Sequence, residues 1–421
     1  MREFADLARR ALHESGYSIK AAARATHYDI SYLSRVLNGK QKPSVKLAQS
    51  LDTLVGAGGE LVVIVLNPGD PMNWSLSPGR AAPGGESTDS VVPPVLSLAD
   101  FLPEGDPLSV AERRVGRRLG VTQVDDLRQR VHGLRLADDL LAGGDLIHPA
   151  CRELRRAVKM YRESTFSVAI GRQLLRQVGE LSQITGWIAS DAGLHQEAER
   201  IYRLGMSAAR QAEDGALVGN LAGSLAYQMV NTGRETEGLA LAQTALADAG
   251  PEAPPKARAL YWDRVAWAHT KAAGSAHSQQ AMRALGEAAE ALSEDSANSA
   301  GYETPAYLYW VNSGELRIME SRIYTELRRP LRAVPLLREV LSEYDATHAR
   351  EMALYLSWLA VALADANEPE ESAAVTERVI ALSSEIASER VAERVRAILR
   401  TLRRYADVPE VAALLAEYST A

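Results

Sequence analysis

The chain has 421 residues, of which 24% are charged and 46% are hydrophobic, so it can form two or three domains with sizeable cores. Acidic residues outnumber basic ones by 54 to 47, and the resulting net charge of −7 excludes a protein that coats nucleic acid along its whole surface. No apolar segment approaches the roughly 20 residues that span a bilayer, and Met1 does not begin a signal peptide. Cys151 is the only cysteine and has no partner for a disulfide within the chain. These features predict a cytoplasmic protein with no membrane partner.

The charge is unevenly distributed along the chain. Residues 1–60 hold nine basic and six acidic side chains, whereas residues 171–421 hold 25 basic and 34 acidic ones. A local basic surface is therefore still possible at the N-terminus.

Residues 3–55 predict four or five short helices in quick succession, because apolar residues recur there at helical spacing. The last three helices are expected at Ile19–Ala25, Ile30–Leu37 and Val45–Val55. Residue types that favour a helix start or stop flank them: Ser18, Asp29, Asn38-Gly39, Pro43-Ser44 and Gly56.

Residues 60–66 contain a β-branched run and are the one credible strand in the sequence. Residues 67–95 are rich in Pro, Gly and Ser, a composition that predicts a flexible linker. The sequence thus divides into a small domain at 1–66, the linker, a helical connector at 96–172 and a repeat region at 173–421.

The repeat region predicts stacked helical hairpins. Its turn signals recur mostly about 40 residues apart: Ala192-Gly193, Thr232-Gly233, Ala273-Gly274, Arg329-Pro330, Asn367 to Pro369 and Asp407 to Pro409. A small residue follows each turn and lets paired helices approach closely: Ala198, Gly238, Ala281, Ala333, Ala373 and Ala412. This pattern resembles a tetratricopeptide array, although another α-solenoid with two helices per repeat remains open.

The segment from Ser18 to Ser44 resembles the lambda-repressor-like, xenobiotic-response-element type of helix-turn-helix. The matching residues are Leu33-Ser34-Arg35-Val36, Asn38-Gly39-Lys40 and Pro43-Ser44. Two positions depart from the family pattern: Ile19 replaces a frequent Gln, and His27 occupies a turn position that usually carries Gly.

This resemblance implies that the helix at Ile30–Leu37 reads a major groove of double-stranded DNA. Helical geometry places Leu33, Val36 and Leu37 inward and leaves the base-reading candidates Ile30, Ser31, Tyr32 and Arg35 outward. Phosphate contacts are expected from flanking donors: Ser18, Lys20, Asn38, Lys40, Lys42 and Ser44. The alternative is that these are ordinary solvated side chains of a small protein-binding domain.

In the repeat region, polar and aromatic residues of the first helices of the hairpins are candidates for binding a peptide or a small molecule. They are Asn220, Tyr227, Gln228, Asn231, Arg264, Trp310, Asn312 and Arg317. The competing interpretation is structural, because a tryptophan at helical spacing more often fills a core than a ligand cage.

No catalytic, metal or cofactor motif is present: the sequence lacks the His-x-x-x-His spacing, the phosphate-binding loop and the nucleophile elbow. The adjacent carboxylates Asp125-Asp126 and Asp138-Asp139 point to different sides of a helix and are expected to be solvated. The sequence therefore predicts neither an enzyme nor a bound cofactor.

The order of helix-turn-helix, linker and tetratricopeptide-like repeats resembles one-component transcription regulators of actinobacteria and, more distantly, peptide-sensing quorum regulators. This resemblance implies an all-α transcription regulator that binds an operator as a homodimer and responds to a ligand or partner of its repeats. The alternative class is an interaction scaffold whose solenoid sequesters a protein or peptide.

Overall fold

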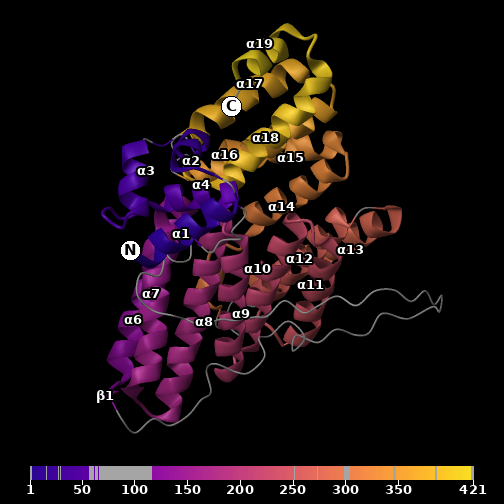
Figure 1. The fold of residues 1–421 in the computed structure, drawn as a ribbon. Coiled ribbons are helices and arrows are strands. Elements are labelled where there is room, and N and C mark those ends of the chain that lie inside the picture. The colour runs from indigo at the N-terminus through magenta and orange to yellow at the C-terminus, as the bar shows by residue number, and fades with distance from the viewer. Residues whose placement is uncertain are drawn as a thin grey trace, which may run out of the picture. The chain divides into compact units, whose positions relative to one another are not determined.

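The computed structural model describes residues 2–55, 61, 65 and 116–418, apart from positions 16, 27, 29, 251, 273, 298–303, 345–347 and 385. The chain divides into two compact units, residues 1–92 and 93–421. In both units the described residues are mostly helical, as Figure 1 shows, so the predicted all-α fold class is confirmed. The linker predicted at 67–95 lies outside the described residues.

The first unit contains α1 (Arg2–Glu14), α2 (Ile19–Ala25), α3 (Ile30–Leu37) and α4 (Val45–Val55). The Ser18 hydroxyl accepts a hydrogen bond from the Ala21 N–H at 3.2 Å and so caps the start of α2. Gly39 ends α3 with a left-handed φ of 68°. The helices α2, α3 and α4 begin and end where the sequence predicted.

The strand predicted at residues 60–66 is wrong at the positions described, because Leu61 and Val65 are helical. The N–H of Leu61 donates to the Asp52 carboxylate at 2.8 Å, and the Leu61 side chain is fully buried. A run of β-branched residues has only a weak preference for a strand. The hydrogen bond to Asp52 and the burial of the Leu61 side chain outweigh that preference.

The second unit opens with a two-stranded parallel pair, β1 (Arg117–Arg118) and β2 (Ser164–Thr165). None of its described helices is long and apolar enough to cross a bilayer. The helices are α6 (Val121–Leu140), α7 (Gly143–Glu163), α8 (Val168–Asp191), α9 (His195–Gln211), α10 (Gly215–Asn231), α11 (Glu235–Ala249), α12 (Pro255–Lys271), α13 (Ser275–Ala297), η2 (Ala306–Leu308), α14 (Ser313–Glu326), α15 (Pro330–Glu343), α16 (Ala349–Asp365), α17 (Pro369–Ser383), α18 (Glu389–Leu402), η3 (Arg403–Tyr405) and α19 (Pro409–Tyr418).

From α8 to α17, consecutive helices form five packed pairs, α8 with α9 through α16 with α17, and a predicted turn separates the members of each pair. The last predicted turn lies between η3 and α19, but α19 packs on α17 and η3 and not as the partner of α18. Five of these turns contain a residue with positive φ: Gly193, Gly233, Gly274, Arg328 and Asn367. Glycine adopts this conformation without a steric penalty, whereas Arg328 is held in it against its preference.

Five of the six small residues predicted to follow the turns are buried, and Ala412 is exposed. The prediction is wrong at Ala412, because in α19, the last described helix, Val411 and Leu414 face the core instead. Gly238 shows the constraint most clearly. A Cβ atom there would lie 2.4 Å from Val230 Cγ2 and 2.8 Å from the Ala226 carbonyl oxygen.

We expect Gly238→Ala to lower the melting temperature, because overpacking a helix contact costs about 1–3 kcal/mol of unfolding free energy. The control is Gly286→Ala in α13, where a Cβ meets no atom within 4 Å. That change should stabilise the helix by about 0.5–1 kcal/mol. Circular dichroism melting of both variants checks the prediction, and equal shifts in the two would contradict it.

Candidate functional site

The described side chains of α3 divide into a buried face and an exposed face. Leu33, Val36 and Leu37 are fully buried, whereas Ile30 is 45% exposed and Arg35 is exposed. This is the division that the sequence predicted. The side chain of Ser31 lies outside the described residues.

Tyr32 has a structural role besides the base contact predicted for it. Its ring stacks on Tyr28 with centroids 5.8 Å apart, and its hydroxyl accepts a hydrogen bond from the Ser44 N–H at 3.4 Å. The Arg35 Nε donates to Gln41 Oε1 at 2.9 Å. Both contacts tie α3 to the segment that follows it.

Three of the predicted phosphate donors are bonded within the domain. Ser18 caps α2, the Ser44 hydroxyl accepts from the Leu47 N–H at 3.1 Å, and the Asn38 amide donates to the Ser34 carbonyl oxygen at 2.8 Å. The lysines predicted with them, Lys20, Lys40 and Lys42, are exposed. Ile19 is 37% exposed, and His27 lies outside the described residues.

A comparison with protein families assigns this first unit. A family model described as a helix-turn-helix domain matches residues 3–63. Residues 3–63 are a helix-turn-helix domain. Such a domain indicates DNA binding and a role in transcription. No curated protein and no solved structure matches the chain.

The second unit, a large helical domain, contains a partly open cavity of about 1200 Å³. Residues from α6 to α18 line it, and all eight ligand-binding candidates are among them. Those eight are Asn220, Tyr227, Gln228, Asn231, Arg264, Trp310, Asn312 and Arg317. A volume of this size accommodates a drug-sized molecule or a short peptide.

Aromatic rings from four helices form a row along the cavity wall. Tyr227 lies 5.8 Å from Trp187 and 6.2 Å from Trp267, measured between ring centroids. Trp267 in turn meets Trp358 edge-on at 5.7 Å. Trp267 and Trp358 are largely buried, as the structural interpretation of the tryptophans predicted, yet both also line the cavity.

Several of the candidate polar residues already hold neighbouring groups. The Gln228 amide donates to the His195 carbonyl oxygen at 2.7 Å, and Asn231 Oδ1 accepts from the Trp267 indole N–H at 3.2 Å. Asn312 Oδ1 caps α14 by accepting from the Glu315 N–H. Arg317 is paired with Glu339 outside the cavity lining. Asn312 and Arg317 therefore have a structural use in addition to their place in the wall.

The sequence analysis did not name seven of the arginines that line the cavity, and two of these seven, Arg322 and Arg394, lie against Trp358. Arg322 in α14 lies 4.6 Å from the centroid of Trp267 and 5.5 Å from that of Tyr227, and it donates to the Tyr227 hydroxyl at 2.5 Å. Arg394 in α18 lies 3.5 Å from the centroid of Trp358. No sequence spacing relates two residues that come from helices so far apart in the chain.

These cations set the electrostatics of the aromatic row. Burial disfavours the Tyr227 phenolate, but the charges of Arg322, Arg390 and Arg264 outweigh burial and lower the pKa of Tyr227. Burial, reinforced by the nearby charge of Arg322, lowers the pKa of Arg394 to about 10. Three guanidinium groups therefore act on the Tyr227 hydroxyl in this part of the cavity.

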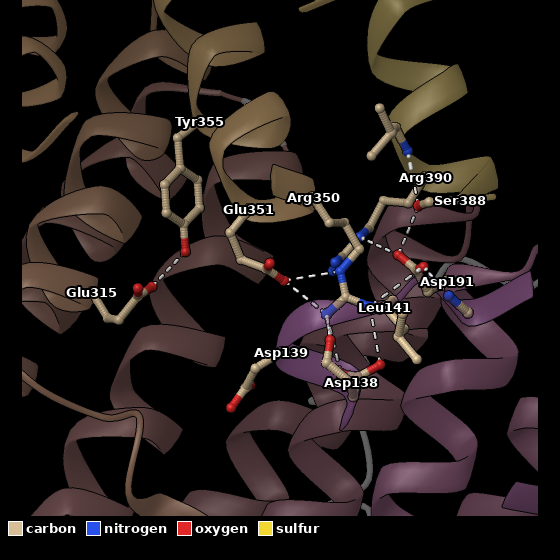
Figure 2. Close-up of polar contacts among 12 residues, drawn as sticks. Asp138, Asp139, Leu141, Asp191, Glu315, Arg350, Glu351, Tyr355, Ser388 and Arg390 are labelled. Atoms are coloured by element: carbon tan, nitrogen blue, oxygen red, sulfur yellow. Dashed lines mark hydrogen bonds and ion pairs between the residues drawn. The ribbon is translucent and has the colours of Figure 1, made fainter. Parts of the chain in front are cut away.

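In the cavity wall, a largely buried cluster joins α6 and α8 to α16 and α18 (Figure 2). Arg350 in α16 donates to Asp138 in α6 at 3.0 Å and to the Leu141 carbonyl oxygen at 3.0 Å. Asp191, at the end of α8, accepts from the Ser388 hydroxyl at 2.9 Å and pairs with Arg390 at 3.0 Å. We call Asp138, Asp191, Arg350, Ser388 and Arg390 the closure cluster.

The closure cluster corrects the expectation that Asp138 and Asp139 are solvated. Asp138 is 5% exposed, and burial raises its pKa to about 6 against the lowering effect of the Arg350 charge. Asp139 accepts a hydrogen bond from the Tyr309 hydroxyl at 2.5 Å. The two carboxylates do point apart, but each finds a partner from a distant part of the chain. Asp125, of the other pair, contacts Arg128 at 2.7 Å.

In the described part of the chain, no group of three or more His, Cys, Asp and Glu side chains is arranged to hold a metal ion. Burial raises the pKa of the Cys151 thiol to about 12, so this cysteine is protonated at neutral pH.

We expect Arg350→Met to destabilise the helical domain by about 3–5 kcal/mol, because it leaves the buried Asp138 without its cation. Arg396→Gln is the matched control, since this exposed arginine of α18 pairs with Glu389 at the surface. An exposed pair contributes about 0–1 kcal/mol. Thermal unfolding of both variants measures the loss of stability. Similar decreases in melting temperature in the two variants would refute the role given to Arg350.

Proposed function

We propose that the protein is a sequence-specific transcriptional regulator that reads an operator with α3 and is controlled by a ligand or partner of the helical domain. The observation that carries the proposal is the exposed face of α3 within a helix-turn-helix domain. The proposal includes no catalytic step.

The residue types on α3 suit base recognition. The Arg35 guanidinium has the donors to bind O6 and N7 of guanine, and Ile30 can pack on a thymine methyl group. Lys40 and Lys42 follow the helix and supply the charge that phosphates attract.

For the helical domain we propose a tetratricopeptide-like solenoid whose cavity receives the controlling ligand. Paired helices, turns about 40 residues apart and small residues at the pair contacts support this proposal. A ligand controls DNA binding only if it binds the competent and incompetent states with different affinity.

The rival function is an interaction scaffold with the helix-turn-helix as a docking surface. The affinity for DNA through several phosphate contacts falls by orders of magnitude between about 50 and 200 mM salt. The affinity for a protein partner that docks without ionic contacts does not fall in this way. The steepness of the salt dependence of complex formation with selected oligonucleotides separates the two.

We expect Arg35→Ala to remove operator preference and to leave weak nonspecific binding, because a lost bidentate base contact costs about 1–3 kcal/mol. Lys40→Ala and Lys42→Ala serve as the comparison. They should weaken specific and random DNA alike and flatten the salt slope. Titrations of selected and scrambled duplexes check both expectations. An equal loss of affinity for the two DNAs in Arg35→Ala would contradict the base-reading role of Arg35.

We further expect a homodimer held by the helical domain, with two helix-turn-helix domains reading an inverted repeat. One small domain contacts too few base pairs for useful specificity, and two-fold symmetry solves that problem. Sedimentation of the full chain and of residues 96–421 tests this. A dimeric full chain with a monomeric 96–421 fragment would place the interface elsewhere.

A further inference from the structure

The cavity of the helical domain combines many charges, and most of its cations are neutralised by a carboxylate. Lys271 pairs with Glu326 at 3.2 Å, and Arg135 pairs with Glu180 at 2.9 Å. The remaining pairs are Arg264–Asp263, Arg317–Glu339, Arg350–Asp138, Arg390–Asp191, Arg396–Glu389 and Arg400–Glu393.

Arg322 and Arg394 differ from these cations. Neither has a carboxylate within ion-pair distance among the residues that the structure describes, although acidic residues outnumber basic ones in 171–421. Arg322 binds the Tyr227 hydroxyl, and Arg394 Nε donates to the Ser357 hydroxyl at 2.9 Å. Their guanidinium charges are therefore bound only by neutral groups and ring faces.

Both guanidinium groups lie against the same indole. The ring centroid of Trp358 is 5.3 Å from the Arg322 Cζ and 3.5 Å from the Arg394 Cζ. The Nε of Arg322 is buried and has no hydrogen-bond partner in the described part of the chain. Two like charges and an unused donor therefore come together where Trp267 and Trp358 meet.

Arg322 and Arg394 are half-buried, and two half-buried like charges on one indole are costly to hold unless a counter-charge is bound. The carboxylates whose charges act on these two arginines are engaged elsewhere. Glu326 pairs with Lys271, Glu393 with Arg400, and the buried Asp263 with Arg264. The lowered pKa of Tyr227, which the charges of Arg322, Arg390 and Arg264 bring about against burial, is consistent with this excess of positive charge. An anion that enters the cavity would relieve it.

We propose that Arg322 and Arg394 bind the carboxylate of an organic anion whose apolar part lies along the row of Trp187, Tyr227 and Trp267. Guanidinium groups bind a carboxylate through paired, charge-assisted hydrogen bonds, and aromatic faces bind an apolar body. This deepens the proposed function, because it names the chemistry of the controlling ligand.

A free aromatic or aliphatic acid and the C-terminus of a short peptide both offer a carboxylate beside an apolar group. The cavity of about 1200 Å³ has room for either. We therefore test both sources with probes of known structure. Phenylacetate is compared with its neutral amide, and an N-acetylated dipeptide ending in phenylalanine is compared with its C-terminal amide.

Calorimetry and tryptophan fluorescence of the full-length protein measure the binding. We expect saturable binding of at least one acid and at least tenfold weaker binding of its amide. The charged contact that the amide lacks contributes about 1.5–3 kcal/mol, which corresponds to a tenfold loss or more. Equal binding of acid and amide, or no saturable binding of either acid at millimolar concentration, would overturn the proposal.

Arg322→Gln and Arg394→Gln should each weaken the acid about tenfold or more, and Arg322→Lys, which keeps the charge, should lose less. The matched control is Arg400→Gln, because Arg400 lines the same cavity but is exposed and paired with Glu393 at 3.0 Å. Far-ultraviolet circular dichroism shows whether each variant is folded. A folded Arg394→Gln with undiminished affinity contradicts the site.

DNA titrations with and without the bound acid separate this inference from the proposed function. A change in operator affinity supports both. Binding of the acid with no change in operator affinity supports the anion site and refutes control through it.

Discussion

The positive charge of Arg350 holds together two parts of the helical domain that lie far apart in the sequence. It is surrounded by Asp138, Glu351 and Asp191 and is 4% exposed, so almost none of its charge is screened by water. Because Asp138 lies in α6 and Arg350 in α16, the contact joins two helices whose residues line the cavity. A buried ion pair of this kind contributes little net stability compared with apolar packing, but breaking it is costly. Its main effect is to fix which helices meet.

Arginine therefore has two different uses in the same domain. In the closure cluster it is neutralised by carboxylates and defines the architecture. At Arg322 and Arg394 it is held by ring faces and hydroxyl groups, and its charge remains available to a ligand. Stacking orients a guanidinium without consuming its charge, because the ring contributes polarisable electron density and no countercharge.

Local patterns in the sequence were sufficient to predict the helical hairpins, their turns and the inward face of α3. Those features depend on residues a few positions apart, such as Leu33, Val36 and Leu37. The strand at Leu61 and Val65 was mispredicted because tertiary contacts outweighed a weak local preference. Asp138 was taken as solvated because its partner lies 212 residues away. Arg322 and Arg394 were missed for the same reason, since only the folded chain brings them to one indole.

The 212-residue separation between Asp138 and Arg350 also bears on how the domain forms. Most helix pairs are neighbours in the chain, so they meet after short loop closures and can assemble one after another. The closure cluster joins α6 and α8 to α16 and α18, so it can form only after the helix pairs between them have assembled. Loop-closure entropy grows only logarithmically, by about 0.6 kcal/mol per doubling of length, so the long separation slows the final step more than it penalises the finished fold. Once formed, the closure cluster ties α6 and α8 to α16 and α18, so local opening of these helices must break a buried ion pair.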